Sequence, residues 1–208
     1  MPWMVARRHC GSCCSEPGNS ATTDGSETRA TPKEVTNFWF SPQSRPHWLS
    51  ASDAFDAEVQ ERFGTLCDRA RAGELDDWAK TPEGALALIL LLDQVPRNIY
   101  RNTAQAFASD ATALEFARKA VSSGFDRDAG KDERLFYYLP FEHTEDCATQ
   151  DEAVRLIEAL GDEEHAEYAR RHHDIIQRFG RFPHRNAQLG RTSTEEEIEF
   201  LNQPDASF

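Results

Sequence analysis

The apolar run from Ala85 to Leu92, with the sequence ALALILLL, constrains the fold more than any other part of this chain. A helix that is apolar on every side has no face for water, so it has to lie in the middle of a core. Pro82 fits the first turn of such a helix, and Pro96 is expected to kink or end it. The run is far shorter than the ~20 apolar residues that a membrane span needs. We therefore expect a central buried helix and no membrane partner.

The rest of the chain from Thr31 onward has the spacing of amphipathic helices and no convincing alternation of period two. The last predicted helix begins at Ser193, where Glu196 makes a capping box and Ile198 and Leu201 are expected to face inward. The other predicted helices are a short one near Val35 to Trp39, Ser52–Ala72, Asp110 to the stop at Gly124, Lys131–Tyr138, Phe141–Cys147 after a break at Pro140, Asp151–Leu160 and Asp162–Phe179. These segments predict an all-α fold of roughly eight or nine helices packed in antiparallel pairs.

The charge and the N-terminal composition limit the function classes. The chain has 36 acidic and 23 basic residues and a net charge of −13, which argues against nucleic acid or anionic lipid as a partner. Residues 1–32 are rich in Ser, Thr, Gly and Cys and are predicted to be a disordered extension, and residues 33–208 a single all-helical domain. Without a clear secretory signal we expect a cytoplasmic protein. Import into an organelle through the basic first residues is the alternative.

Positive charge gathers in one segment of this acidic chain, residues 178–191, with the sequence RFGRFPHRNAQLGR. Planar guanidinium groups suit carboxylate or phosphate. Its candidate binding residues are Arg178, Arg181, His184, Arg185, Asn186 and Arg191. Two interpretations stay open: ion pairs with Asp93, Glu142 and Glu145 that fasten the segment to the core, and an anion-binding pocket. Stacking on RNA bases is a third interpretation, which the overall charge disfavours.

Further polar candidates follow the buried helix. Arg97 and Asn98 come directly after it, and they could line a pocket or, in the case of Arg97, pair with Asp93 to fix the kink at Pro96.

Another group lies at Glu142, His143 and Glu145, where carboxylates flank a histidine and could support acid–base chemistry or simply favour a helix N-terminus. His172 lies on the apolar stripe of a predicted helix. It could be a core histidine whose hydrogen bonds are satisfied within the protein, or it could be part of a site. We take Glu142, His143 and His184 as candidate catalytic residues. No metal or cofactor is predicted, because the sequence has no glycine-rich phosphate loop, HExxH or paired CxxC motif.

Several motifs resemble those of one known family, the mostly bacterial proteins that carry domain of unknown function 924. The matching pieces are FWF at 38–40, FD at 55–56, AGELDDW at 72–78, LLDQVPRNIYR at 91–101, AFASD at 106–110, LPFEHTED at 139–146, the HxxIIxRFGRFPHRN pattern at 172–186 and LGRTSTEEE at 189–197. The resemblance implies an α-α superhelix similar to tetratricopeptide-repeat proteins, and it implies no reaction. The family usually has a bulky residue where this chain has Val95.

Two functions follow as hypotheses. The first is the binding of a small anionic ligand in a pocket lined by arginine, histidine and glutamate, because polar groups from separate segments would meet there. The second is a tetratricopeptide-repeat-like scaffold that binds a peptide or partner protein, which depends on analogy of fold. The sequence leaves open whether the protein is an enzyme.

Overall fold

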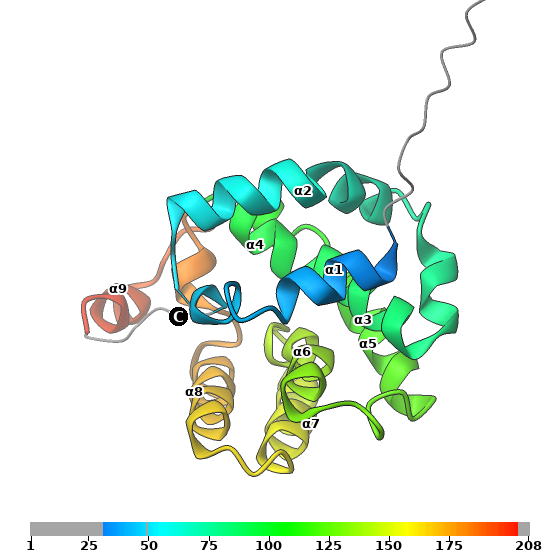
Figure 1. Cartoon of the computed structure of the whole chain (residues 1–208). Coiled ribbons are helices and arrows are strands. Elements are labelled where there is room, and N and C mark those ends of the chain that lie inside the picture. Colours follow the sequence, from blue (N-terminus) through cyan, green and yellow to red (C-terminus); the bar gives the residue numbers. More distant parts are fainter. Residues whose placement is uncertain (1–30, 49, 204–208) are drawn as a thin grey trace, which may run out of the picture.

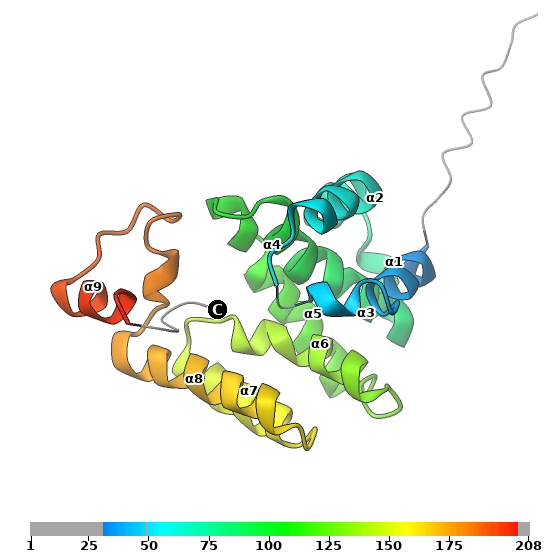
Figure 2. The ribbon, with the colours of Figure 1, turned by 60° about the vertical axis from the view of Figure 1, so that its left-hand side comes forward.

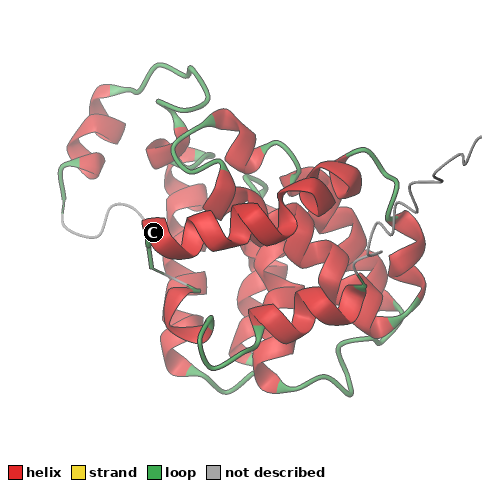
Figure 3. Ribbon diagram, turned by 45° about the horizontal axis from the view of Figure 1, so that its top comes forward, coloured by secondary structure: helices red, strands yellow, loops and turns green. Residues whose placement is uncertain are grey.

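The computed structural model describes residues 31–48 and 50–203. Its regular secondary structure there consists of helices joined by loops and turns, with no strand (Figure 3). The α-helices are α1 (Pro32–Trp39), α2 (Asp53–Arg71), α3 (Pro82–Ile89), α4 (Val95–Ile99), α5 (Asp110–Ser122), α6 (Lys131–Glu142), α7 (Cys147–Glu158), α8 (Glu163–Phe179) and α9 (Glu195–Leu201). The all-α prediction is therefore confirmed. The predicted extension over 1–32 lies almost entirely outside the described residues.

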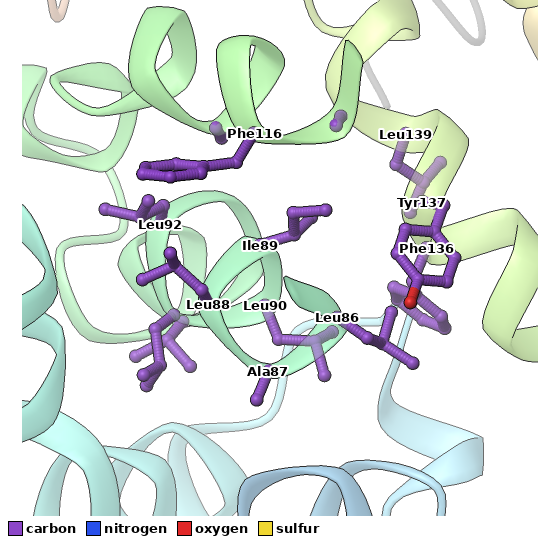
Figure 4. Packing of buried hydrophobic residues seen from close by; sticks show 14 of the residues in the cluster. Leu86, Ala87, Leu88, Ile89, Leu90, Leu92, Phe116, Phe136, Tyr137 and Leu139 are labelled. Carbon is purple, nitrogen blue, oxygen red and sulfur yellow. The ribbon is translucent and has the colours of Figure 1, made fainter. Parts of the chain in front are cut away.

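Helix α3 occupies the centre, as its apolar sequence predicts. Every residue from Ala85 to Leu92 is at most 3% exposed. Figure 4 shows leucines of this run between Phe116 of α5 on one side and Phe136, Tyr137 and Leu139 of α6 on another. Burial of so many aliphatic side chains is the main favourable contribution to folding, at roughly 25 cal/mol per Å² of apolar surface removed from water.

The remaining helices pack around α3 largely in chain order. Helix α1 lies against α3 and α2 against α4, and the later helices contact each other in the order α5 with α6, α6 with α7 and α7 with α8. Figures 1 and 2 show α7 and α8 side by side as a hairpin, with α9 set apart from the main body. These sequential pairs are consistent with the predicted superhelix, whose likeness to tetratricopeptide repeats stays a prediction.

The predicted break at Pro140 is wrong. Helix α6 continues through Pro140 to Glu142, and the separate helix predicted over 141–147 does not form, because residues 143–146 are a non-helical connection between α6 and α7. Proline removes one backbone donor, but the side chains on both sides of it are buried in the core, and this packing outweighs the lost hydrogen bond. Helix α7 then begins at Cys147, where the Asp146 side chain accepts from the Thr149 amide at 2.9 Å.

The last helix also differs from its prediction. Its capping box lies one residue later than predicted, at Thr194 and Glu197, with the Thr194 amide donating to Glu197 Oε2 at 2.7 Å. Ile198 is 50% exposed and Leu201 36% exposed, so neither faces inward. The helix is short and contacts the neighbouring segment through Phe200, which packs on Phe179 of α8.

Candidate functional site

A π-helical turn, Leu90–Gln94, joins α3 to α4 and creates the centre of the candidate site. Pro96 has no amide hydrogen and its ring displaces the carbonyl four residues earlier, that of Leu92. The Ser109 hydroxyl donates to this Leu92 oxygen at 2.6 Å, which satisfies it inside the protein. Widened turns of this kind frequently occur at functional sites. Here the turn carries Asp93, whose side chain is fully buried.

Asp93 is held by donors from three directions. Gln94 Nε2 donates to Oδ2 at 2.5 Å, His143 Nδ1 lies 2.7 Å from Oδ1, and Arg97 Nη1 lies 3.2 Å from Oδ1. Burial alone would raise the pKa of Asp93, but the charges of Arg97 and His143 and the hydrogen bonds from His143 and Gln94 outweigh it and lower the pKa. Asp93 is therefore an ionised carboxylate that fixes the ring of His143.

Two arginines share a second carboxylate, Asp110, at the start of α5. Arg97 binds it with both terminal nitrogens, Nη1 at 2.8 Å and Nη2 at 3.0 Å. Arg185 reaches the same carboxylate through Nη1 at 3.2 Å, and the same nitrogen donates to the His143 carbonyl at 3.0 Å. Arg97 thus contacts two carboxylates, Asp93 and Asp110, whereas Arg185 contacts only Asp110, which it shares with Arg97.

Arg185 lies between two aromatic rings. Its guanidinium carbon is 4.6 Å from the centroid of Phe107 and 4.4 Å from that of Phe182, within the range of cation–π attraction. The side chain is 7% exposed, and its buried Nε has no hydrogen-bond partner. Burial, and then the charge of Arg97, lower the pKa of Arg185 to about 10. The positive charge of this residue is incompletely compensated.

Neutral acids and bases complete the surroundings. Burial and the charge of Asp93 raise the pKa of Glu142 to about 8, so this carboxyl is mostly protonated at neutral pH. His172 Nδ1 lies 2.9 Å from the Tyr168 carbonyl and 3.3 Å from Glu142 Oε1. Burial lowers the pKa of His172 well below its usual value, and burial followed by the charge of Arg185 lowers that of His184 to about 4.

We call this set the central polar cluster. Its members are Asp93, Arg97, Asp110, Glu142, His143, His172, His184 and Arg185. They come from the α3–α4 junction, from the ends of α5 and α6, from α8 and from the segment that follows α8 (orange in Figures 1 and 2).

We call residues 180–194 the covering segment, because they carry Phe182 and Arg185 onto the cluster. Gly180 ends α8 in the left-handed conformation, with φ of 68°. Glu145 then holds the segment in place, accepting from the Phe182 amide at 2.8 Å and from two nitrogens of Arg191 at 2.7 and 2.9 Å. Arg181 binds Glu197 of α9 with Nε at 2.6 Å and Nη2 at 2.8 Å. These ion pairs fasten the segment at both ends.

The structure brings half of the sequence-predicted residues together. Arg97, Glu142, His143, His172, His184 and Arg185 belong to the central polar cluster. The other six make contacts elsewhere: Asn98 with Asp56 of α2, Glu145 with Arg191, Arg178 with the exposed Glu196, Arg181 with Glu197, and Asn186 with Ser193 and Glu197. The contacts of these six residues hold segments of the chain to one another.

Sequence reasoning missed three members of the site. Phe107 and Phe182, which enclose Arg185, were not among the candidates, and Asp110 was expected only to start a helix. A signal existed in the AFASD motif at 106–110, which holds Phe107, the Ser109 that caps the Leu92 carbonyl, and Asp110.

Two cavities open elsewhere on the molecule. One of about 350 Å³ lies between α1, α3 and α6 and includes Leu86 and Tyr137, and one of about 420 Å³ lies between α1 and α2 and includes Phe38 and Phe55. Neither includes a member of the central polar cluster. Within residues 31–48 and 50–203, no three His, Cys, Asp or Glu side chains are arranged to hold a metal ion. None of the described helices has the length and apolar content to cross a membrane.

In its described residues the chain is an all-helical protein with a buried cluster of arginine, histidine and carboxylate side chains. The chain belongs to the family described as bacterial protein of unknown function (DUF924), whose model matches residues 35–205. It is similar to the solved structure of a protein of unknown function from Agrobacterium tumefaciens, with 41% identity and a TM-score of 0.80, over 83% of this chain and 97% of the other. No curated protein matches this chain.

Proposed function

We propose that the central polar cluster binds a small anionic molecule and that Arg185 holds its negative charge. The observation that carries the proposal is the incomplete pairing of this buried guanidinium. Arg185 shares Asp110 with Arg97, and its Nε makes no hydrogen bond in the protein. A buried charge without a full partner costs several kcal/mol in general. A carboxylate or phosphate at Arg185 would recover part of that free energy.

The aromatic enclosure of Arg185 favours the same function. Phe107 and Phe182 restrict the guanidinium plane, so little side-chain freedom remains to be lost when a ligand binds. Such a fixed, planar fork matches the geometry of a carboxylate or phosphate. His143, His172 and His184 around it are neutral and add hydrogen-bonding groups without opposing charge.

The covering segment controls access to the cluster in this proposal. His143 and Arg97 have side chains that are 12% and 19% exposed, so the cluster lies just beneath the surface. A ligand enters when the segment opens away from α6, and Arg185, which the segment carries, meets the ligand as the segment closes. Glu145 limits the opening through its bonds to Arg191 and to the Phe182 amide.

A thermal-shift titration tests the proposal on the full chain, with sodium succinate and sodium phosphate as probes and sodium chloride at matched ionic strength as the reference. We expect both probes to raise Tm, because a ligand at 100 times its Kd stabilises the folded state by about 2.7 kcal/mol. Arg185→Lys keeps the charge but loses the planar fork and Nε, and it should abolish most of the rise.

Arg178→Lys is the matched control, since Arg178 pairs with Glu196 and its side chain is 48% exposed. This variant should keep the full rise in Tm. The proposal is wrong if Arg185→Lys, shown by circular dichroism to be folded, responds to both anions like the unmodified protein. An equal loss in both variants would mean that the anions act on general surface charge.

A scaffold that binds a partner protein is the second candidate function. The observation in its favour is the exposure of Ile198 and Leu201 on α9, two apolar residues on a helix that stands apart from the main body (Figure 2). Contiguous exposed apolar surface can mark a protein-binding site. Two exposed side chains on a short helix are weaker support for a scaffold than the incompletely paired guanidinium of Arg185 is for anion binding.

A further inference from the structure

We propose that the anion site is also catalytic, with His143 as the general base in the hydrolysis of a small ester that carries a carboxylate. This inference depends on the proposed function, because Arg185 holds the carboxylate of the substrate. It goes further in assigning a reaction class and a role to each side chain around the base.

The contact with Asp93 determines which nitrogen of His143 is basic. An ionised carboxylate can only accept, so the His143 Nδ1 that lies 2.7 Å from Asp93 Oδ1 must carry the hydrogen. Nε2 of the neutral ring then keeps its lone pair and can take a proton. Gln94 and Arg97 hold the other contacts of the Asp93 carboxylate, which fixes its position. Asp93 is therefore a positioning residue, in the same relation to His143 as the aspartate of a hydrolase triad to its histidine.

A buried carboxyl group at the end of α6 is the candidate proton donor. Glu142 precedes His143 at the end of α6, is 5% exposed and is protonated at neutral pH. Its Oε1 lies 3.3 Å from His172 Nδ1, and that nitrogen also faces the Tyr168 carbonyl at 2.9 Å, so it carries a hydrogen. The rings of His143 and His172 are 6.4 Å apart between centroids. One base and one acid with separated pKa values are the pair that general acid–base catalysis needs.

The reaction balances with these groups and water alone. His143 Nε2 takes a proton from water while the water oxygen forms a bond to the ester carbonyl carbon. The bond from that carbon to the alcohol oxygen breaks, and the Glu142 carboxyl gives its proton to the departing oxygen. The imidazolium of His143 then releases its proton to water and the Glu142 carboxylate takes one up from water, so one ester and one water give one acid and one alcohol.

The charged and titratable groups that face His143 come from every neighbouring element. The charged ones are Asp93 and Arg97 of the α3–α4 junction, Asp110 of α5 and Arg185 of the covering segment, and the titratable groups that are neutral at pH 7 are Glu142 of α6, His172 of α8 and His184 of the covering segment. Burial and the charge of Arg97 lower the pKa of His143 against the pull of Asp93. We expect kcat to fall on the acid side as His143 becomes protonated, and on the alkaline side as Glu142 loses its proton.

Hydrolysis of two matched esters by the full chain tests this inference. Mono-4-nitrophenyl succinate carries a carboxylate, and 4-nitrophenyl 4-methylpentanoate has the same shape without charge. The charged ester also loses 4-nitrophenolate spontaneously through attack of its own carboxylate, so the rate without protein is subtracted for each ester. The remaining release of 4-nitrophenolate should be faster for the charged ester. His143→Gln should lower kcat for that ester by about 10²–10⁴-fold, the usual contribution of a general base. His173→Gln changes a histidine on α8 that contacts Asp151 at the surface, and it should leave the rate unchanged.

The outcomes separate the two proposals. If succinate raises Tm but His143→Gln hydrolyses the charged ester as fast as the unmodified protein does, the catalytic inference is wrong and anion binding stands. If succinate does not raise Tm, the anion proposal fails and this inference fails with it. If His143→Gln does not fold, Glu142→Gln decides the question with monoethyl succinate as the substrate, because ethoxide, unlike 4-nitrophenolate, needs a proton to leave. Loss of the acid should lower kcat and remove the alkaline limb of the pH profile. An unchanged profile would contradict the inference.

Discussion

Glu142 is the member of the central polar cluster whose pKa lies closest to neutral pH among those with a stated value. Its side chain is enclosed at the end of α6, and burial and Asp93 raise its pKa to about 8. A carboxyl in the unfolded chain has a pKa near 4.3. Between these two values the folded protein binds a proton that the unfolded chain has released, so the contribution of Glu142 to stability decreases as pH rises from about 4.5 to about 8.

Glu142→Gln removes this pH dependence while keeping the size of the side chain. We expect the variant to gain stability relative to the unmodified protein as pH rises from 5 to 8, by about 1 kcal/mol or more at pH 7. Urea unfolding at several pH values measures the difference. A difference that is constant between pH 5 and pH 8 would show that Glu142 is ionised in the folded protein throughout that range.

At the scale of elements, the covering segment depends on Glu145. This carboxylate binds Arg191 and the Phe182 amide, and burial, which would raise its pKa, is outweighed by the hydrogen bonds from Arg191 and Phe182, so its pKa is lowered. Phe182 is fully buried and covers one face of Arg185. Loosening of this contact therefore exposes the cluster without disturbing the core around α3.

Glu145→Gln should make the covering segment open more often. Loss of the charged acceptor is expected to speed hydrogen exchange of the Phe182 amide by roughly tenfold, since an unsatisfied buried group costs about 1–3 kcal/mol. Exchange of amides in α3 should not change. Glu196→Gln, which removes the exposed partner of Arg178, serves as the control and should leave Phe182 protected. Equal protection of Phe182 in both variants would contradict this role of Glu145.

For the whole molecule, the apolar run and the helical spacing were enough to predict the class of fold and its central helix. They were not enough at Pro140, because local sequence predicts a break there and only the packed core on both sides of it keeps α6 intact. The prediction that Ile198 and Leu201 of α9 face inward was likewise wrong. Periodicity shows that these two residues share a face of the helix, but it does not show what that face contacts. Tertiary contacts decide both cases.

The candidate site was predictable only in part for a similar reason. Arginine and histidine stand out in an acidic chain, and Arg97, His143 and Arg185 do converge. Which carboxylate each arginine meets depends on acids far away in sequence, such as Glu197 for Arg181 and Glu145 for Arg191. The aromatic enclosure depends on how the α4–α5 connection places Phe107 over Arg185. No spacing along the chain shows that contact.

The central claim is that Arg185, the buried arginine of the segment, has spare capacity to bind an anion, whereas Arg181 does not, because both oxygens of Glu197 bind it. Nuclear magnetic resonance of the arginine Nε–H groups during a succinate titration measures this most directly. The account predicts a saturable shift of the Arg185 signal, whose Nε has no partner in the protein, and little change for Arg181, whose Nε already binds Glu197. An Arg185 signal that does not move, or that moves no more than that of Arg181, would contradict the account.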